Sequence, residues 1–155
     1  MNEQEISQER ASFLEQDFDR GFINFCGFKA ELAQWGRFHS RLEIEDKHRQ
    51  QDGFIHAGVM ATMADHTAGY SAFTTVTEDM QILTIEFKIN FLRPAFGRLL
   101  VCRSHVIREG RQIIVSESEI FDVGDQINEM AVAKAIVTLM AVPRSKLLKG
   151  SLNSK

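Results

Sequence analysis

The segment Gly53–Asp65, GFIHAGVMATMAD, places a glycine, a histidine, a helix start and an acid within one short stretch. Apolar residues recur with helical spacing after Ala57, namely at Val59, Met63, Tyr70 and Phe73. No proline interrupts the chain before Pro94. The spacing therefore predicts a helix from Ala57 to about residue 73 or 74.

The opposite side of this predicted helix carries small residues and one acid, Asp65. Spacings of three, four and seven put them on one stripe: Gly58, Ala61, Asp65, Ala68, Gly69 and Ala72. Another backbone can approach such a stripe closely. Aspartate is unfavourable inside a helix and costly to bury, so Asp65 is a candidate functional carboxylate. The alternative is a solvated or structurally hydrogen-bonded aspartate.

The start of the predicted helix offers hydrogen-bond donors. The first N–H groups of a helix lack partners within it and carry the positive end of its dipole. The N–H groups of Ala57 and Gly58 can therefore stabilise an oxygen that becomes negative, as in an oxyanion hole. His56 can brace the turn through a ring nitrogen, and the alternative for His56 is a purely structural turn histidine.

These residues resemble the His-Gly-Gly segment and helix of the hotdog-fold acyl-CoA thioesterases, in the PaaI-like and THEM-like branch. The resemblance covers roughly Ala30 to Val142. The matching positions are Gln50, His56, Ala57, Gly58, Asp65, Thr84 and the stretch Ile89–Ala95, INFLRPA. Ala57 stands where the family usually has glycine, and Gln50 where it often has asparagine. Both keep the donor group, but they bear on which substrate fits.

The resemblance implies an α+β hotdog fold, with one long helix wrapped by a single antiparallel sheet. The sequence pattern predicts strands at 29–36, 38–45, 83–91, 98–107, 112–122 and 131–142. The alternation in 83–91 predicts one buried face. The last strand is almost continuously apolar, which predicts a central strand covered on both sides.

Composition fits one domain without disulfides or a metal: 155 residues, 44% hydrophobic and 25% charged. We divide it into an N-terminal helical lead-in (1–27), a hotdog thioesterase domain (28–143) and a flexible tail (144–155). An amphipathic helix is predicted within residues 5–18. The aromatic residues that follow it are expected to serve packing: Phe22, Phe25 and Phe28.

Several functions are excluded by what the chain lacks. The net charge of −3 provides no basic face for nucleic acid. Cys26 and Cys102 have no ligand spacing, so neither a metal site nor a bridge is expected. No signal peptide and no apolar stretch long enough to cross a bilayer is evident, so we expect a cytoplasmic protein that does not bind membranes. No Gly-x-Ser-x-Gly turn supports a serine hydrolase.

The reaction implied by the resemblance is hydrolysis of a fatty or aryl acyl-CoA to a free acid and CoA. CoA is then part of the substrate, and no cofactor is expected. The Ala57 or Gly58 N–H and the Gln50 amide would hold the carbonyl oxygen. Asp65 would activate water or attack directly, and Thr84 would hold the water, although an ordinary strand threonine fits equally well.

The resemblance also gives expected binding residues for CoA. They are Phe91, Arg93, Gly110, Arg111, Gln112 and Lys134. The alternative for Arg93, Arg111 and Lys134 is that they are solvated surface charges without a ligand. The acyl chain is expected to lie against apolar side chains: Phe54, Met60, Met63 and Phe73.

An open sheet leaves strand edges that attract another chain, so a homodimer is expected. The resembling family pairs sheets edge to edge and often doubles into a homotetramer, with each active site shared between subunits. Two other functions stay open: a hotdog 3-hydroxyacyl thioester dehydratase or hydratase, and a non-catalytic acyl-CoA sensor. The acyl group, and the choice between CoA and a carrier protein, also stay open.

Overall fold

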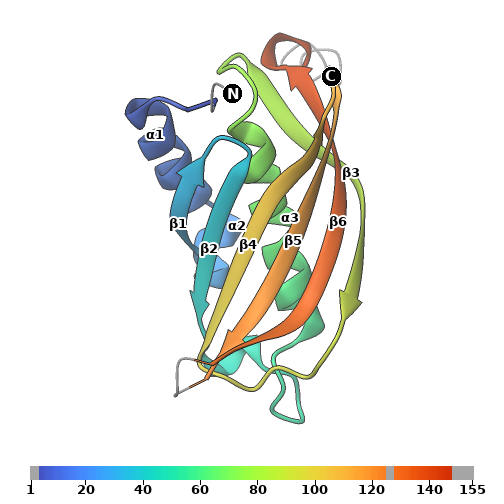
Figure 1. Ribbon diagram of the computed structural model, residues 1–155. Helices are drawn as coiled ribbons and strands as arrows, with labels where there is room; N and C mark the ends of the chain where they lie inside the picture. The colour runs from blue at the N-terminus through green and yellow to red at the C-terminus, as the bar shows by residue number, and fades with distance from the viewer. Residues whose placement is uncertain (1–3, 125–127, 148–155) are drawn as a thin grey trace, which may run out of the picture.

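The computed structural model of the protein describes residues 4–124 and 128–147. The chain begins with two helices, a strand hairpin and one long helix, and ends with four strands (Figure 1). Their bounds are α1 Gln8–Phe18, α2 Phe22–Cys26, β1 Lys29–Gln34, β2 Arg37–Glu43, a 3-10 turn Asp46–His48, α3 Ala57–Phe73, β3 Met80–Phe91, β4 Leu99–Glu109, β5 Ile113–Val123 and β6 Glu129–Pro143.

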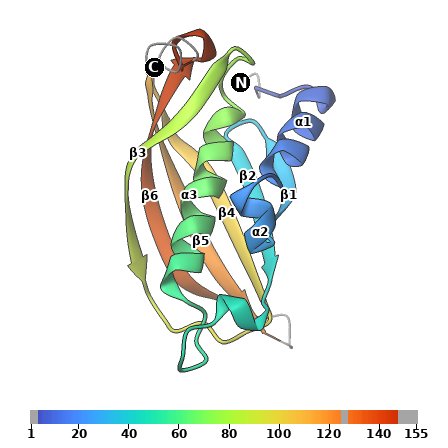
Figure 2. The ribbon, with the colours of Figure 1, turned by 180° about the vertical axis from the view of Figure 1, so that it is seen from behind.

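All six strands form one antiparallel sheet in the order β1-β2-β4-β5-β6-β3. The helix α3 lies along one face of the sheet, and the strands curve around it (Figure 2). This confirms the expected α+β architecture, a single sheet wrapped around one long helix. The predicted helix from Ala57 to about residue 73 is also confirmed.

The core lies between α3 and the sheet, and α1 closes it at the β1 side. Ser7 caps α1 by accepting a hydrogen bond from the Arg10 N–H, so this helix begins at Gln8. Phe18, at the end of α1, is buried and stacks on Phe38 of β2 with ring centroids 5.1 Å apart. The N-terminal helix is therefore part of the core.

A layer of buried hydroxyl groups separates α3 from the strands beneath it. Ser40 on β2 contacts Thr67 on α3 at 2.7 Å, and Ser118 on β5 donates to the Ala64 carbonyl at 2.8 Å. Small side chains let the helix approach the sheet closely, and each hydroxyl satisfies a buried polar partner. The bond to Ala64 fixes the helix backbone beside Asp65.

The prediction of one buried face for residues 83–91 is wrong for a single chain. Leu83 and Ile85 are 43% and 50% exposed, and Phe87 and Phe91 are exposed as well. The reason is position: β3 is an edge strand that pairs only with β6. A register shift between Thr84 and Glu86 also interrupts its alternation. The free chain therefore carries an apolar edge.

The prediction that the last strand is covered on both sides is also wrong. In β6, Ala135, Val137 and Leu139 face α3 and are buried, whereas Ile136 between them is exposed. The strand has neighbours on both edges, but in the described part of the chain only one face of the sheet carries a helix.

The expectation that the aromatic residues after α1 serve packing holds only in part. Phe28 is buried, but Phe22 and Phe25 are 64% and 75% exposed. The helix α2 has only five residues, and of these only Ile23 is buried. Most of the predicted tail, residues 148–155, lies outside the described residues, as does residue 125 of the predicted last hairpin.

Candidate active site

The start of α3 is fixed by His56, which occupies the N-cap position. The ring Nδ1 of His56 accepts a hydrogen bond from the Gly58 N–H at 2.8 Å, and the backbone N–H of His56 donates to the His48 carbonyl at 2.8 Å. A Cβ on residue 58 would come 3.0 Å from that ring nitrogen, so the cap favours glycine here. The Gly58 N–H is thus already hydrogen-bonded to His56 and is not open to a ligand.

The N–H of Ala57 is the open donor at this helix start. The Val59 N–H bonds to the His56 carbonyl at 3.0 Å, and within residues 4–124 and 128–147 we find no acceptor for the Ala57 N–H. An unpaired N–H at the positive end of a seventeen-residue helix is suited to binding a developing negative charge. Of the two predicted donors, the geometry favours Ala57.

Gln50 lies on a turn that precedes the helix. Its N–H donates to the Phe54 carbonyl at 2.8 Å, and its carbonyl accepts from the Gly53 N–H at 3.0 Å. Gly53 has φ +87°, which glycine adopts readily. The side-chain Oε1 of Gln50 accepts a hydrogen bond from the Asp52 N–H. Its Nε2 has no acceptor in the part of the chain that the structure describes, so its two N–H groups can donate to a ligand.

A cleft of about 570 Å³ opens in front of this helix start. It brings together the predicted residues Gln50, His56, Ala57, Phe91 and Arg93. The remaining walls are Gln51, Phe54, Ile55, Met60, Leu92, Pro94 and Ala95. Two of the four residues expected to contact the acyl chain, Phe54 and Met60, line the cleft.

Two other expected acyl contacts do not line the cleft. Met63 and Phe73 are buried in the core, and both lie further from the helix start than Met60, Phe73 being the last residue of α3. That part of the expectation is therefore wrong for a single chain.

Asp65 lies halfway along α3 and does not line the cleft. It is half-buried, and Thr84 of β3 donates a hydrogen bond to its Oδ1 at 2.8 Å. Asp65 follows Ala57 by eight residues, which at the rise of a helix separates them by about 12 Å along the axis. Within one chain, the carboxylate and the open N–H are too far apart to act on one carbonyl group.

The residues expected to bind CoA fall into three places. Phe91 and Arg93 are at the cleft, and the Arg93 guanidinium donates to the Ala131 carbonyl at 3.0 Å. The hairpin with Gly110, Arg111 and Gln112 is at the opposite end of the sheet (Figure 1). Lys134 contacts Glu117 at 2.8 Å and Glu119 at 3.3 Å. The hydrogen bond that the Lys134 ammonium donates to the Glu117 carboxylate raises the pKa of Lys134.

His66, next to Asp65, belongs to the contact between α1 and α3. Its ring lies 4.5 Å from the Phe18 ring and 4.9 Å from the Tyr70 ring, and Nε2 is 3.2 Å from the Phe18 carbonyl. Burial lowers the pKa of His66. The ring therefore packs against α1 rather than beside the Asp65 carboxylate.

Two residues that support the cleft escaped the sequence analysis. Arg49 donates hydrogen bonds to the carbonyl groups of Gly53, Phe96 and Gly97, and Asp122 accepts from the N–H groups of Phe96 and Gly97. A signal for Asp122 was available, because it is an acid at an inward-facing position of a strand. For Arg49, the only feature of the sequence that could have indicated a role is its position next to Gln50.

Comparison with known proteins identifies the family. The Thioesterase superfamily profile matches residues 52–128, which include α3, β3 and the cleft residues other than Gln50 and Gln51. A thioesterase family protein from Silicibacter pomeroyi has a crystal structure that is 33% identical with a TM-score of 0.80, covering 84% of this chain and 96% of that one. The chain belongs to the thioesterase superfamily. It is accordingly a thioester hydrolase.

Two further relatives of this thioesterase carry CoA in their names. The 1,4-dihydroxy-2-naphthoyl-CoA hydrolase of Listeria monocytogenes is 26% identical over 102 residues, which cover 66% of this chain and 83% of the relative. The Streptococcus mutans protein smu.793, solved bound to acetyl CoA, is 24% identical with a TM-score of 0.67, covering 80% of this chain and 93% of that one. The similarity to the Streptococcus mutans protein supports the fold alone.

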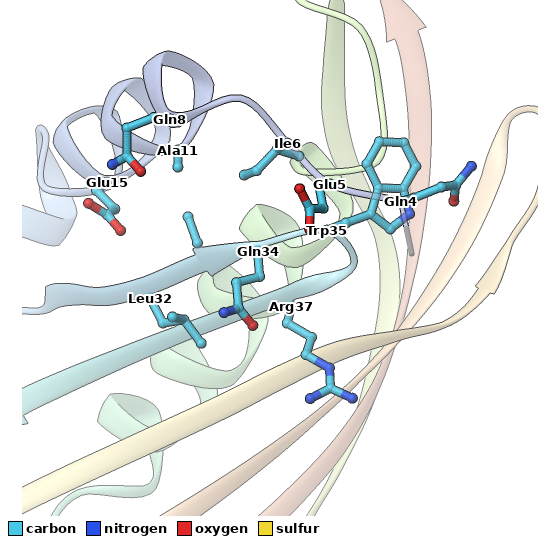
Figure 3. Close-up of a pocket in the computed structure, with 11 residues that line it drawn as sticks. Gln4, Glu5, Ile6, Gln8, Ala11, Glu15, Leu32, Gln34, Trp35 and Arg37 are labelled. Carbon is cyan, nitrogen blue, oxygen red and sulfur yellow. The ribbon is translucent and has the colours of Figure 1, made fainter. Parts of the chain in front are cut away.

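The thioesterase has a second and larger groove, of about 700 Å³, between α1 and the β1–β2 hairpin (Figure 3). Gln8 and Glu15 of α1 line it opposite Leu32 and Gln34 of β1. None of the residues that line it is a predicted site residue, so we assign the chemistry to the smaller cleft. No described helix of this thioesterase is both long and apolar enough to cross a membrane.

Proposed function

We propose that this protein hydrolyses a fatty or aryl acyl-CoA to the free acid and CoA, at a site built from two copies of the chain. The observation that carries the proposal is the separation of its two halves. The open N–H of Ala57 and the Asp65 carboxylate are about 12 Å apart on one helix, so the thioester must meet Asp65 of one chain and Ala57 of the other.

Ala57 and Gln50 form the oxyanion hole in this mechanism. The thioester carbonyl oxygen enters the cleft and accepts hydrogen bonds from the Ala57 N–H and the Gln50 Nε2, both free of acceptors in the described residues. These bonds strengthen as the oxygen becomes negative in the transition state. A single donor of this kind typically contributes about 10²–10³-fold to turnover.

Asp65 acts as the general base. Thr84 occupies Oδ1, which leaves Oδ2 to accept a proton from a water molecule while the water oxygen bonds to the carbonyl carbon. The tetrahedral intermediate then collapses, the carbon–sulfur bond breaks, and the CoA thiolate takes up the proton. An alkyl thiol is a much stronger acid than an alcohol, with a pKa of about 8.5 for cysteine, so the thiolate leaves more readily than an alkoxide. Direct attack by Asp65 is the alternative first step.

The free edge of β3 supports a homodimer that assembles this site. Thr84 holds Asp65 on the side of α3 that faces this edge, and the apolar side chains Leu83, Ile85 and Phe87 are exposed along it. In a two-fold dimer, paired β3 edges run antiparallel, and so do the two α3 helices. Asp65 of one chain then approaches the helix start of the other. Further pairing into a homotetramer stays a prediction.

The same pairing supports the expected CoA contacts. The hairpin of Gly110, Arg111 and Gln112 is at the opposite end of the sheet from the cleft, so a two-fold copy carries its hairpin towards the cleft of the first chain. Arg93 and Arg111 would then face the phosphate groups from two sides. The names of the Listeria and Streptococcus relatives support a CoA thioester.

Free-thiol release tests this function directly. We expect release from some members of a panel of short, medium, long-chain and aryl acyl-CoAs, and at least a 10²-fold lower kcat for Asp65→Asn with an unchanged midpoint of thermal unfolding. Asp79→Asn, an exposed aspartate after α3, is the matched control and should keep full activity. Binding without thiol release across the panel would favour the acyl-CoA sensor instead.

The dehydratase alternative requires a second catalytic group beside Asp65. His66 is the adjacent candidate, and its ring is engaged with Phe18 and Tyr70. We therefore expect no hydration of enoyl-CoA substrates, measured by loss of the conjugated absorbance.

A cytoplasmic location stays a prediction from sequence.

A further inference from the structure

Two segments far apart in sequence form facing walls of the cleft. The first wall is the turn Gln50–Phe54, which carries the oxyanion donor Gln50. The second wall is the segment Leu92–Gly97 after β3. They meet where the Ile55 N–H donates to the Ala95 carbonyl at 2.9 Å.

The second wall is anchored to the sheet. Asp122 of β5 is buried, and its Oδ2 accepts hydrogen bonds from the Phe96 N–H at 2.9 Å and the Gly97 N–H at 3.0 Å. A Cβ on Gly97 would overlap the other oxygen of the same carboxylate. The Leu92 N–H adds a bond to the Val132 carbonyl at 2.8 Å. This wall therefore has a fixed position relative to β5 and β6.

Within the described residues, the first wall has one backbone hydrogen bond to the second, from the Ile55 N–H directly after the turn. Its backbone bonds between Gln50, Gly53 and Phe54 close the turn on itself. The Arg49 side chain adds a second link: one guanidinium nitrogen donates to the Gly53 carbonyl at 3.0 Å and to the Phe96 carbonyl at 3.2 Å, and another donates to the Gly97 carbonyl at 3.0 Å. The Phe54 and Phe96 rings, 4.6 Å apart, pack beside this link.

We infer that Arg49 is a positioning residue, which holds the Gln50 side chain at the oxyanion hole by tying its turn to the Asp122-anchored wall. The inference rests on the proposed function. The planar guanidinium suits this role because its fixed array of N–H groups reaches three carbonyl oxygens in a set geometry. Arg49 makes no contact with the reacting atoms in this scheme and acts only through Gln50.

The variant Arg49→Lys tests the inference because it keeps the positive charge and loses the multiple donor geometry. We expect kcat to fall about tenfold while KM changes less than twofold, since a misplaced donor weakens transition-state binding more than substrate binding. Arg41→Lys, an arginine in exposed ion pairs with Glu31 and Glu43, is the matched control and should keep kcat. A rise in KM alone would overturn the inference and make Arg49 a substrate contact.

A double-mutant cycle with Gln50→Ala separates positioning from general damage. Arg49→Lys should lower kcat in the wild-type background and have no further effect once the Gln50 amide is gone. An equal fold-loss in both backgrounds would overturn the inference, and so would a Gln50→Ala variant with full turnover.

Amide hydrogen exchange supplies a readout that does not depend on turnover. The Gly53 N–H, which closes the turn on the Gln50 carbonyl, should exchange faster in Arg49→Lys and at the wild-type rate in Arg41→Lys. Unchanged exchange would overturn the inference even if the proposed function holds. Absence of thiol release by the wild-type protein would instead overturn the proposed function, and the exchange result would still decide whether Arg49 holds the turn.

Discussion

At the scale of single residues, His56 shows how one side chain can serve structure and chemistry together. Its ring caps α3 by accepting the Gly58 N–H, and this leaves the neighbouring Ala57 N–H as the free donor. The cap thus selects which N–H group faces the cleft. Whether the ring has any role beyond the cap can be tested by a residue that caps equally well.

Asparagine is such a residue. We expect His56→Ala to lower the free energy of unfolding by about 1 kcal/mol, because a capping acceptor is lost, and to lower kcat through a frayed helix start. His56→Asn should restore both quantities, measured by chemical denaturation and thiol release. Restored stability with low kcat would contradict this and assign the imidazole itself a part in catalysis.

Local sequence patterns predicted the local structure around the candidate site, but not which donors and acceptors form hydrogen bonds there. The helix start at Ala57, the glycine turn at Gly53 and the odd acid Asp65 follow from short-range rules of helix and turn chemistry. The choice between the Ala57 and Gly58 donors does not, because it depends on the rotamer of His56. The contacts of Arg49 with Phe96 and Gly97 join residues almost fifty positions apart, which no local pattern encodes.

At the scale of elements, alternation predicted the strands but not their neighbours. A period of two is a local property, so the ranges of β3, β4, β5 and β6 agree closely with the sequence pattern. Burial depends on where a strand lies in the sheet. The chain places β3 at the edge beyond β6, so an apolar pattern typical of a buried strand is exposed in one chain.

Asp122 gives a prediction at this scale, because it joins β5 to the segment after β3. Asp122→Ala would leave the part-buried N–H groups of Phe96 and Gly97 without this acceptor, which costs about 1–3 kcal/mol for each group that stays unpaired. We expect the free energy of unfolding to fall by at least about 2 kcal/mol in urea denaturation. Glu119→Ala, on the outward face of the same strand, should change it by less than about 0.5 kcal/mol. Equal effects of the two variants would contradict the anchoring role.

At the scale of the whole molecule, the two halves of the proposed site are on one helix and would serve different chains in the proposed dimer. Asp65 is the ninth residue of the seventeen in α3, and the free N–H is at the first. A monomer cannot bring them together without breaking the helix, whereas an antiparallel pair of helices does so twice. The proposed second subunit would account both for the exposed apolar edge of β3 and for the separation of the expected CoA contacts.

Subunit complementation tests this arrangement. Asp65→Asn removes the base and Gln50→Ala removes the oxyanion donor, so each variant alone should have low kcat. When equal amounts of the two are unfolded together and refolded, half of the dimers are mixed by random pairing, and each mixed dimer has one site with both intact residues and one site with neither. We expect about one quarter of wild-type turnover per total protein, measured by thiol release at saturating substrate. If each site used residues of a single chain, every site in the mixture would carry one defect, and turnover would stay at the level of the separate variants.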